Sequence, residues 1–205
     1  MKLAAGNAIG FTGCSALRVL VFCTLLLPAP TPAQPGIAES EVPDELRKLL
    51  LEAVSSSDSF DDRFEAEVWL LDMSTRLTPY VSDTRERLDI LKAVHYEATR
   101  AQLHPELVLA VIDIESRFDR FAISRVGALG LMQVMPFWLR ELKRPDDNLF
   151  EITTNLRIGC TILKYYLDKS GGDLRTALAR YNGSMGKRKY PDKVFTALSE
   201  KWFRR

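Results

Sequence analysis

A carboxylic acid closes an apolar stretch in the segment ELVLAVIDIESRF, residues 106–118. Glu115 follows residues 107–114, which are all apolar except Asp113. Apolar surroundings disfavour the charged carboxylate and raise its pKa, so such a group keeps a proton near neutral pH and can act as a general acid. Taken alone, Glu115 is also compatible with a solvated helix end or with an ion pair to a neighbouring arginine.

Two further segments carry polar groups that suit a sugar ligand. GALGLMQVMP, residues 127–136, combines the amide of Gln133 with two glycines, which permit backbone conformations and close approaches that other residues forbid. ARYNGS, residues 179–184, ends a helical pattern with Tyr181 and Asn182. Each segment alone also has an ordinary interpretation, a surface turn for the first and a helix C-terminus for the second.

In this order and spacing, the three segments resemble the lytic transglycosylases of the soluble, goose-lysozyme-like class, whose catalytic part is called the SLT domain. The resemblance extends from about Arg87 to Val194 and includes Tyr190 and the segments NLRIG and GGDLRTALA, at 155–159 and 171–179. One motif departs from the family pattern, because the usual AAYNAG reads ARYNGS here. The resemblance implies an all-α, lysozyme-like helical catalytic domain.

The resemblance also implies a reaction and an acid for it. Family members cleave the β-1,4 bond between N-acetylmuramic acid and N-acetylglucosamine in peptidoglycan. They usually form a 1,6-anhydromuramoyl end instead of adding water. By this resemblance, Glu115 is the catalytic acid and base, and Ser116 steadies its carboxylate or the acetamido group of the substrate.

Further substrate-binding residues follow from the same resemblance. Met132 and Gln133 are expected to line the sugar groove, and Tyr181 to form a hydrogen bond near the catalytic acid. Asn182 is expected to hold its loop, and Tyr190 to border the cleft. The contact of Tyr190 depends on the turn after the ARYNGS motif, whose shape can differ from that in the family because the glycine comes one place early.

Most glycosidases use two carboxylates, yet neither acidic neighbour of Glu115 suits the second role. On a helix, Asp113 points about 200° around the axis from Glu115 and so away from the same bond. Asp119 lies among arginines, where a structural salt bridge is the better interpretation. The acetamido group of N-acetylmuramic acid can replace the second carboxylate, and its C6 hydroxyl can then close the anhydro ring. A muramidase that admits water on the same fold, or a non-catalytic peptidoglycan-binding protein, is the alternative.

Helices must position these residues, because apolar side chains repeat at intervals of three and four through most of the chain. Asp83 or Thr84 can cap a long helix, and Pro105 suits the first turn of the helix that carries Glu115. The apolar run of that helix would also fit a buried strand, but its leucine and alanine content and its helical neighbours favour a helix. We expect helices over 43–53, 60–73, 84–101, 105–115, 136–142, 153–167 and 173–181, and an ordered loop over 118–133.

The first residues have the pattern of a secretory signal, since Lys2 and Arg18 precede an apolar run over 19–27 and a proline- and alanine-rich segment follows. The run is shorter than the about 20 residues that a membrane-spanning helix needs. We therefore expect a periplasmic protein without a stable membrane anchor. The expected parts are a signal peptide over 1–33, a linker and small N-terminal helical extension over 34–82, and the lysozyme-like lytic transglycosylase domain over 83–205.

Composition and cysteine usage restrict the partners and cofactors. The formal net charge of +1 at pH 7 names no partner, and His95, His104 and Cys160 show no metal-ligand spacing. Cys160 lies in an apolar helical pattern, as a small buried hydrophobic residue would. We expect peptidoglycan glycan strands as the substrate, with no cofactor, no metal and no nucleic-acid partner. The N-terminal helices could pack on the catalytic domain, cover one end of its groove or dock a cell-wall assembly partner.

Overall fold

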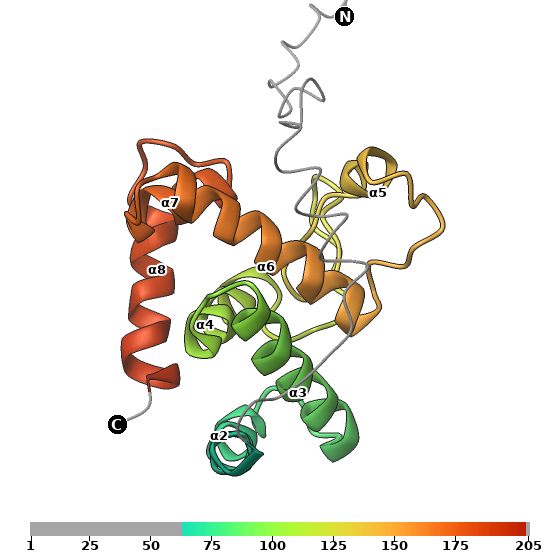
Figure 1. Ribbon diagram of the computed structural model, residues 1–205, viewed down its shortest axis with the longest axis vertical. Helices are drawn as coiled ribbons and strands as arrows, with labels where there is room; N and C mark the ends of the chain where they lie inside the picture. The colour runs from blue at the N-terminus through green and yellow to red at the C-terminus, as the bar shows by residue number, and fades with distance from the viewer. Residues whose placement is uncertain (1–62, 204–205) are drawn as a thin grey trace, which may run out of the picture. The chain divides into compact units, whose positions relative to one another are not determined.

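The computed structural model describes residues 63–203, and Figure 1 shows that this part of the chain is built from helices. The all-α class predicted from the sequence is confirmed. Within residues 63–203, extended pairing is limited to isolated β-bridges of Leu129 with Ile123 and with Val134. The helices are α2 (Arg63–Leu77), α3 (Thr84–Arg100), α4 (Pro105–Glu115), α5 (Phe137–Glu141), α6 (Ile152–Lys169), α7 (Leu174–Tyr181) and α8 (Lys189–Ala197), followed by the π-helical turn η1 (Leu198–Trp202).

Three helix starts follow from local chemistry that the sequence indicates. Asp83 precedes α3, and its carboxylate accepts a hydrogen bond from the backbone N–H three residues on, at 2.7 Å. Asp173 caps α7, where its carboxylate accepts from the backbone N–H two residues on, at 3.1 Å. Both satisfy donors that a first helical turn leaves without a partner. Pro105 stands in the first turn of α4, where a missing N–H breaks no helical hydrogen bond, and α4 then ends at Glu115.

Helix α4 lies inside the helical assembly, which explains its apolar sequence. Residues 107–113 are all buried, and α3, α8 and η1 pack on the helix. A helix covered on several sides is apolar around its circumference instead of along one stripe. The prediction of a helix in place of a buried strand is confirmed, and Glu115 stands where this helix emerges from the core.

Helix α2 shares the hydrophobic core with the rest of the described residues. Trp69 and Leu77 on α2 are buried in this core, and α2 packs on α3 and η1. The indole N–H of Trp69 donates to Oε1 of Glu106 at 2.9 Å, which joins α2 to the first turn of α4. The helix ends at Leu77, a turn beyond its predicted end. The helix expected over 43–53, the signal peptide and the linker lie outside the described residues.

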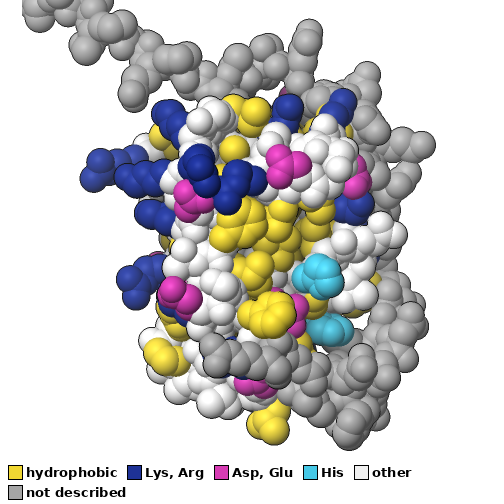
Figure 2. All heavy atoms as spheres, turned by 90° about the vertical axis from the view of Figure 1, so that its left-hand side faces the viewer, with side chains coloured by type: hydrophobic (Ala, Val, Ile, Leu, Met, Phe, Trp, Pro, Cys, Tyr) yellow, Lys and Arg dark blue, Asp and Glu magenta, His cyan; other side chains and the backbone are white. Residues whose placement is uncertain are grey.

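The elements α8 and η1 at the C-terminal end were not predicted from the sequence. Val194, Ala197 and Trp202 on these elements are buried in the core. Pro191 falls within the first turn of α8, where its missing N–H is tolerated. The face that α7 and α8 form carries a group of Lys and Arg side chains (Figure 2).

Across residues 63–203, no helix is both long and apolar enough to span a membrane.

Candidate active site

Glu115, the last residue of α4, lies between two adjoining cavities. The first has a volume of about 300 Å³ and the second of about 290 Å³, and Glu115 and Asn182 line both. Among the described residues that line these two cavities, Glu115 is the only carboxylate. The site therefore offers a single acidic group to a ligand that spans both cavities.

Tyr190, in the first turn of α8, holds the carboxyl group of Glu115. Its hydroxyl donates a hydrogen bond to Oε1 of Glu115 at 2.6 Å. The side chain of Tyr190 is buried, so the hydrogen bond lies in surroundings of low polarity, where it is stronger than in water. The sequence predicted only that Tyr190 borders the cleft, whereas this contact joins it directly to the candidate acid.

Burial raises the pKa of Glu115 from its ordinary 4.5 to about 7, because the charged form loses its hydration. The hydrogen bonds from Tyr190 and Asn182 act in the opposite direction, since they stabilise the carboxylate. With a pKa near 7, both protonation states of Glu115 are accessible at neutral pH. A group that first gives and later takes a proton requires this balance.

Tyr181, at the end of α7, lines the first cavity and supports the loop over 127–136. Its hydroxyl donates to the backbone carbonyl of Met132 at 2.7 Å. Burial and the nearby Glu115 hold the pKa of this hydroxyl well above its ordinary value, so it stays a donor. Of the two tyrosines, Tyr190 donates to Glu115, whereas Tyr181 positions the loop.

Asn155 on α6 holds the same loop through its backbone. Oδ1 of Asn155 accepts from the N–H of Met132 at 2.8 Å, and Nδ2 donates to the carbonyls of Leu129 and Leu149, each at 2.9 Å. Gly130 has a φ of 74°, and a Cβ at this position would lie 2.4 Å from Nδ2 of Asn155. A glycine is therefore required here both by the backbone conformation and by the close approach of the amide.

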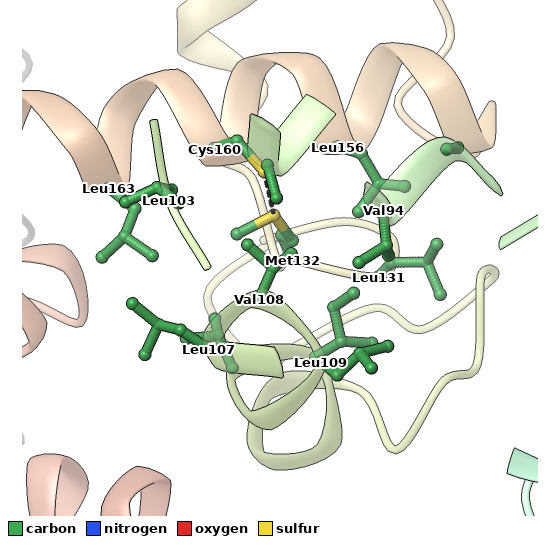
Figure 3. Packing of buried hydrophobic residues seen from close by; sticks show 14 of the residues in the cluster. Val94, Leu103, Leu107, Val108, Leu109, Leu131, Met132, Leu156, Cys160 and Leu163 are labelled. Carbon is green, nitrogen blue, oxygen red and sulfur yellow. Dashed lines mark hydrogen bonds between the residues drawn. The ribbon is translucent and has the colours of Figure 1, made fainter. Parts of the chain in front are cut away.

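Met132 lies in the hydrophobic core, so the prediction that it lines the sugar groove is wrong. Its side chain is fully buried, and Figure 3 shows it between Val108 of α4 and Cys160 of α6. The sulfur atoms of Met132 and Cys160 are 3.8 Å apart. The reason is the space left by Gly159, where a Cβ would lie 2.5 Å from Sδ of Met132. A flexible thioether fills this space and anchors the loop on α6.

Ser116 and Gln133 also use polar groups to hold the loop. The hydroxyl of Ser116 donates to the Leu131 carbonyl at 2.8 Å, and Ser116 lines neither cavity. Nε2 of Gln133 donates to the carbonyls of Gly130 and Ala122, at 2.9 and 3.2 Å. Gln133 does line the first cavity, where a carboxamide oxygen can accept a hydrogen bond from a ligand. Ser116 therefore joins α4 to the loop, and Gln133 borders the groove.

The other two carboxylates near Glu115 in the sequence are engaged elsewhere. Asp113 is 5% exposed, and its Oδ2 accepts from Nζ of Lys201 at 2.9 Å and from the indole N–H of Trp202 at 3.2 Å. The prediction that Asp113 points away is confirmed. Asp119 accepts from the backbone N–H two residues on, at an exposed turn, where the sequence suggested a salt bridge. In the described part of the chain, no three His, Cys, Asp or Glu side chains are grouped as metal ligands.

Two residues of the segment NLRIG, Asn155 and Gly159, position the site, although no role for either was predicted from the sequence. They are four residues apart and so lie on one face of α6. A signal for them was present, because a buried amide within an apolar helical pattern needs hydrogen-bond partners, and the adjacent turn carries a glycine on the same face. The partner of this face, the loop over 127–136, is not evident from spacing alone.

Comparison with known proteins agrees with the resemblance that the sequence motifs indicate. The family model of the transglycosylase SLT domain matches residues 92–203, more than half of the chain. The chain is 36% identical over 104 residues to a transglycosylase of Enterobacteria phage PRD1, which covers 47% of this chain and 38% of that protein. It is 30% identical over 130 residues to a membrane-bound lytic murein transglycosylase C of Yersinia pestis (strain Pestoides F), which covers 56% of this chain and 36% of that protein. The chain thus spans little more than a third of the length of these relatives. By the match over residues 92–203, the chain belongs to the transglycosylase SLT domain family.

Proposed function

We propose that this protein is a peptidoglycan lytic transglycosylase. It cleaves the β-1,4 bond between N-acetylmuramic acid and N-acetylglucosamine and leaves 1,6-anhydromuramoyl ends. The observation that supports this most is Glu115, a single carboxyl group between two cavities with a pKa of about 7. One such group suffices when the substrate itself supplies the nucleophiles.

In the first step, Glu115 acts as the general acid. With a pKa of about 7, Glu115 keeps a protonated population at neutral pH. This proton passes to the glycosidic oxygen as the bond to C1 of N-acetylmuramic acid breaks. The acetamido oxygen of the same sugar attacks C1, so the positive charge is held in an oxazolinium ring and no second carboxylate is needed.

In the second step, the same residue acts as the base. The Glu115 carboxylate, stabilised by the hydrogen bonds from Tyr190 and Asn182, takes the proton of the C6 hydroxyl. The C6 oxygen attacks C1 and opens the oxazolinium ring, which forms the anhydro product and restores the acetamido group. Glu115 ends protonated and ready for another cycle, and no water is consumed.

The first cavity is the proposed seat of the sugar rings. Phe137, Tyr166 and Tyr181 line it with aromatic surface, which suits the apolar faces of a sugar, and Gln133 adds a polar group that can fix its orientation. Asn182 lies at the boundary with the second cavity, where its amide can reach a substituent of the sugar at the scissile bond.

We further propose a location and a division of the chain. Residues 1–33 act as a signal peptide that exports the protein to the periplasm, where its substrate lies. Residues 83–205 form the catalytic domain. The extension over 34–82 includes α2, which packs on this domain, and the segment before α2 is the place for an assembly partner.

Digestion of purified peptidoglycan tests the proposal. The wild-type protein should release soluble muropeptides, whereas Glu115→Gln, which keeps the shape and the acceptor for Tyr190, should release none above background. Asp119→Asn is the matched control, because it also neutralises one carboxylate close in sequence but lines neither cavity. Full release by the Glu115→Gln variant would refute Glu115 as the acid, and hydrated ends would indicate a muramidase.

A further inference from the structure

Three lysines line the second cavity, and no carboxylate neutralises them. Lys187, Lys189 and Lys193 are exposed and share the lining with Glu115, which is the only acidic residue there. Among the described residues, no ion pair involves any of the three lysines. The second cavity therefore presents unpaired positive charge beside the proposed catalytic acid.

The positive lining continues along α8 into an open groove. Ile114, Lys189 and Lys193 also line a further cavity of about 540 Å³, which extends to Lys201. Asp192 borders this groove as well, but its carboxylate pairs with Arg175 and lies 3.9 Å from Arg188. Figure 2 shows the resulting concentration of Lys and Arg side chains on the face of α7 and α8.

Helix stability does not explain this arrangement. Lys189 and Lys193 are four residues apart on α8, a spacing at which like charges repel each other and weaken a helix. They also lie near the start of the helix, where the macrodipole favours acidic side chains. A ligand that brings negative charge to the groove would remove both penalties.

The second cavity and the groove along α8, lined by Lys187, Lys189 and Lys193, are called the lysine groove below. We propose that the lysine groove binds the carboxylates of the stem peptides that N-acetylmuramic acid carries. The inference rests on the proposed function. The sugar rings of the substrate are uncharged, so its negative charge lies on the peptides. The two sides of Glu115 differ accordingly, since the first cavity is lined largely by aromatic and apolar side chains and the second by lysines. The groove thus makes strands with free stem carboxylates better substrates than neutral strands.

The test compares two substrates of nearly the same shape that differ in the charge of their stem peptides. Peptidoglycan strands are used as isolated, or after their carboxylates are converted to amides with a carbodiimide and ammonia. For the wild-type protein, kcat/KM should be about threefold to tenfold higher on the untreated strands, as expected for a few exposed charge pairs, and salt should reduce this ratio. The combined variant Lys187→Gln, Lys189→Gln, Lys193→Gln should bring the ratio close to one.

A charge-matched control uses three lysines that line none of these cavities. The combined variant Lys92→Gln, Lys143→Gln, Lys164→Gln should keep the wild-type ratio. A groove variant that also keeps the wild-type ratio would overturn the proposal, because the preference would then arise elsewhere. Circular dichroism and thermal unfolding of both combined variants verify that they are folded.

A binding measurement separates this proposal from the proposed function. Glu115→Gln protein, with and without the three groove substitutions, is sedimented with untreated and with amidated peptidoglycan. Preferential binding to untreated material that the groove substitutions remove supports the lysine groove even if the wild-type protein forms no anhydro product. Equal binding to both materials would refute the groove, whatever the product of the reaction.

Discussion

Glu115→Gln should raise the free energy of unfolding at neutral pH, although it removes the proposed catalytic group. The folded protein raises the pKa of Glu115 from 4.5 to about 7. Between these two values the folded state binds a proton more tightly than the unfolded state does, so the wild-type protein loses stability as the pH rises through this window. One pH unit corresponds to about 1.36 kcal/mol, so ionisation of Glu115 costs the fold about 3 kcal/mol. Glutamine avoids this cost and still accepts from Tyr190.

Urea unfolding followed by far-ultraviolet circular dichroism measures this effect from about pH 4 to about pH 8. Well below pH 4.5 the carboxyl group of Glu115 is neutral in both the folded and the unfolded protein. The difference in the free energy of unfolding between the variant and the wild type should therefore change little with pH in that range. The advantage of the variant should then grow by about 3 kcal/mol and level off above pH 7. Asp119→Asn, at an exposed turn, serves as the control. If the difference in the free energy of unfolding between Glu115→Gln and the wild type stays constant with pH, the pKa of Glu115 is not raised in the folded protein.

Three more substitutions test the surroundings of this group. Tyr190→Phe removes a hydrogen-bond donor to the carboxylate and should therefore raise the pKa of Glu115 further. The alkaline limb of the pH profile of kcat/KM should then move to higher pH, and a limb that does not move would show that Tyr190 does not stabilise the Glu115 carboxylate. Asn155→Ala removes three hydrogen bonds and should lower the free energy of unfolding by about 3 kcal/mol, against less than about 1 kcal/mol for the exposed Asn148→Ala, as urea unfolding can show. Gly159→Ala places a Cβ 2.5 Å from the sulfur of the buried methionine and should cost about 1 to 3 kcal/mol in the same assay, and a neutral effect would mean that this packing is loose.

Local signals predicted the helices that position Glu115. Asp83 and Pro105 are start signals that act within one turn, and the apolar content of residues 107–112 follows from burial of α4 on several sides. Helix α8 escaped prediction because its exposed face is rich in lysine and its first turn contains a proline. Beyond its first turn only Val194 and Ala197 of α8 are buried, and these two side chains form too narrow a stripe to stand out without the core on which they pack.

The partners of the site residues depend on contacts between distant segments. The sequence places both Tyr181 and Tyr190 near the cleft. The paths of α7 and α8 decide that the hydroxyl of Tyr190 donates to Glu115 and that of Tyr181 to the backbone of Met132. Met132 belongs to the motif of the groove, yet its side chain enters the core because Gly159, far along the chain, leaves room for it. Spacing within a motif carries no information on either contact.

The origin of the oxygen at the new sugar end tests the central proposal most directly. Peptidoglycan is digested by the wild-type protein in water enriched in heavy oxygen, and the muropeptides are measured by mass spectrometry. Attack by the C6 hydroxyl predicts ends that are one water lighter than the hydrolysed form and carry no heavy oxygen. Ends that contain one heavy oxygen atom would show that Glu115 activates water, and would contradict the lytic transglycosylase reaction.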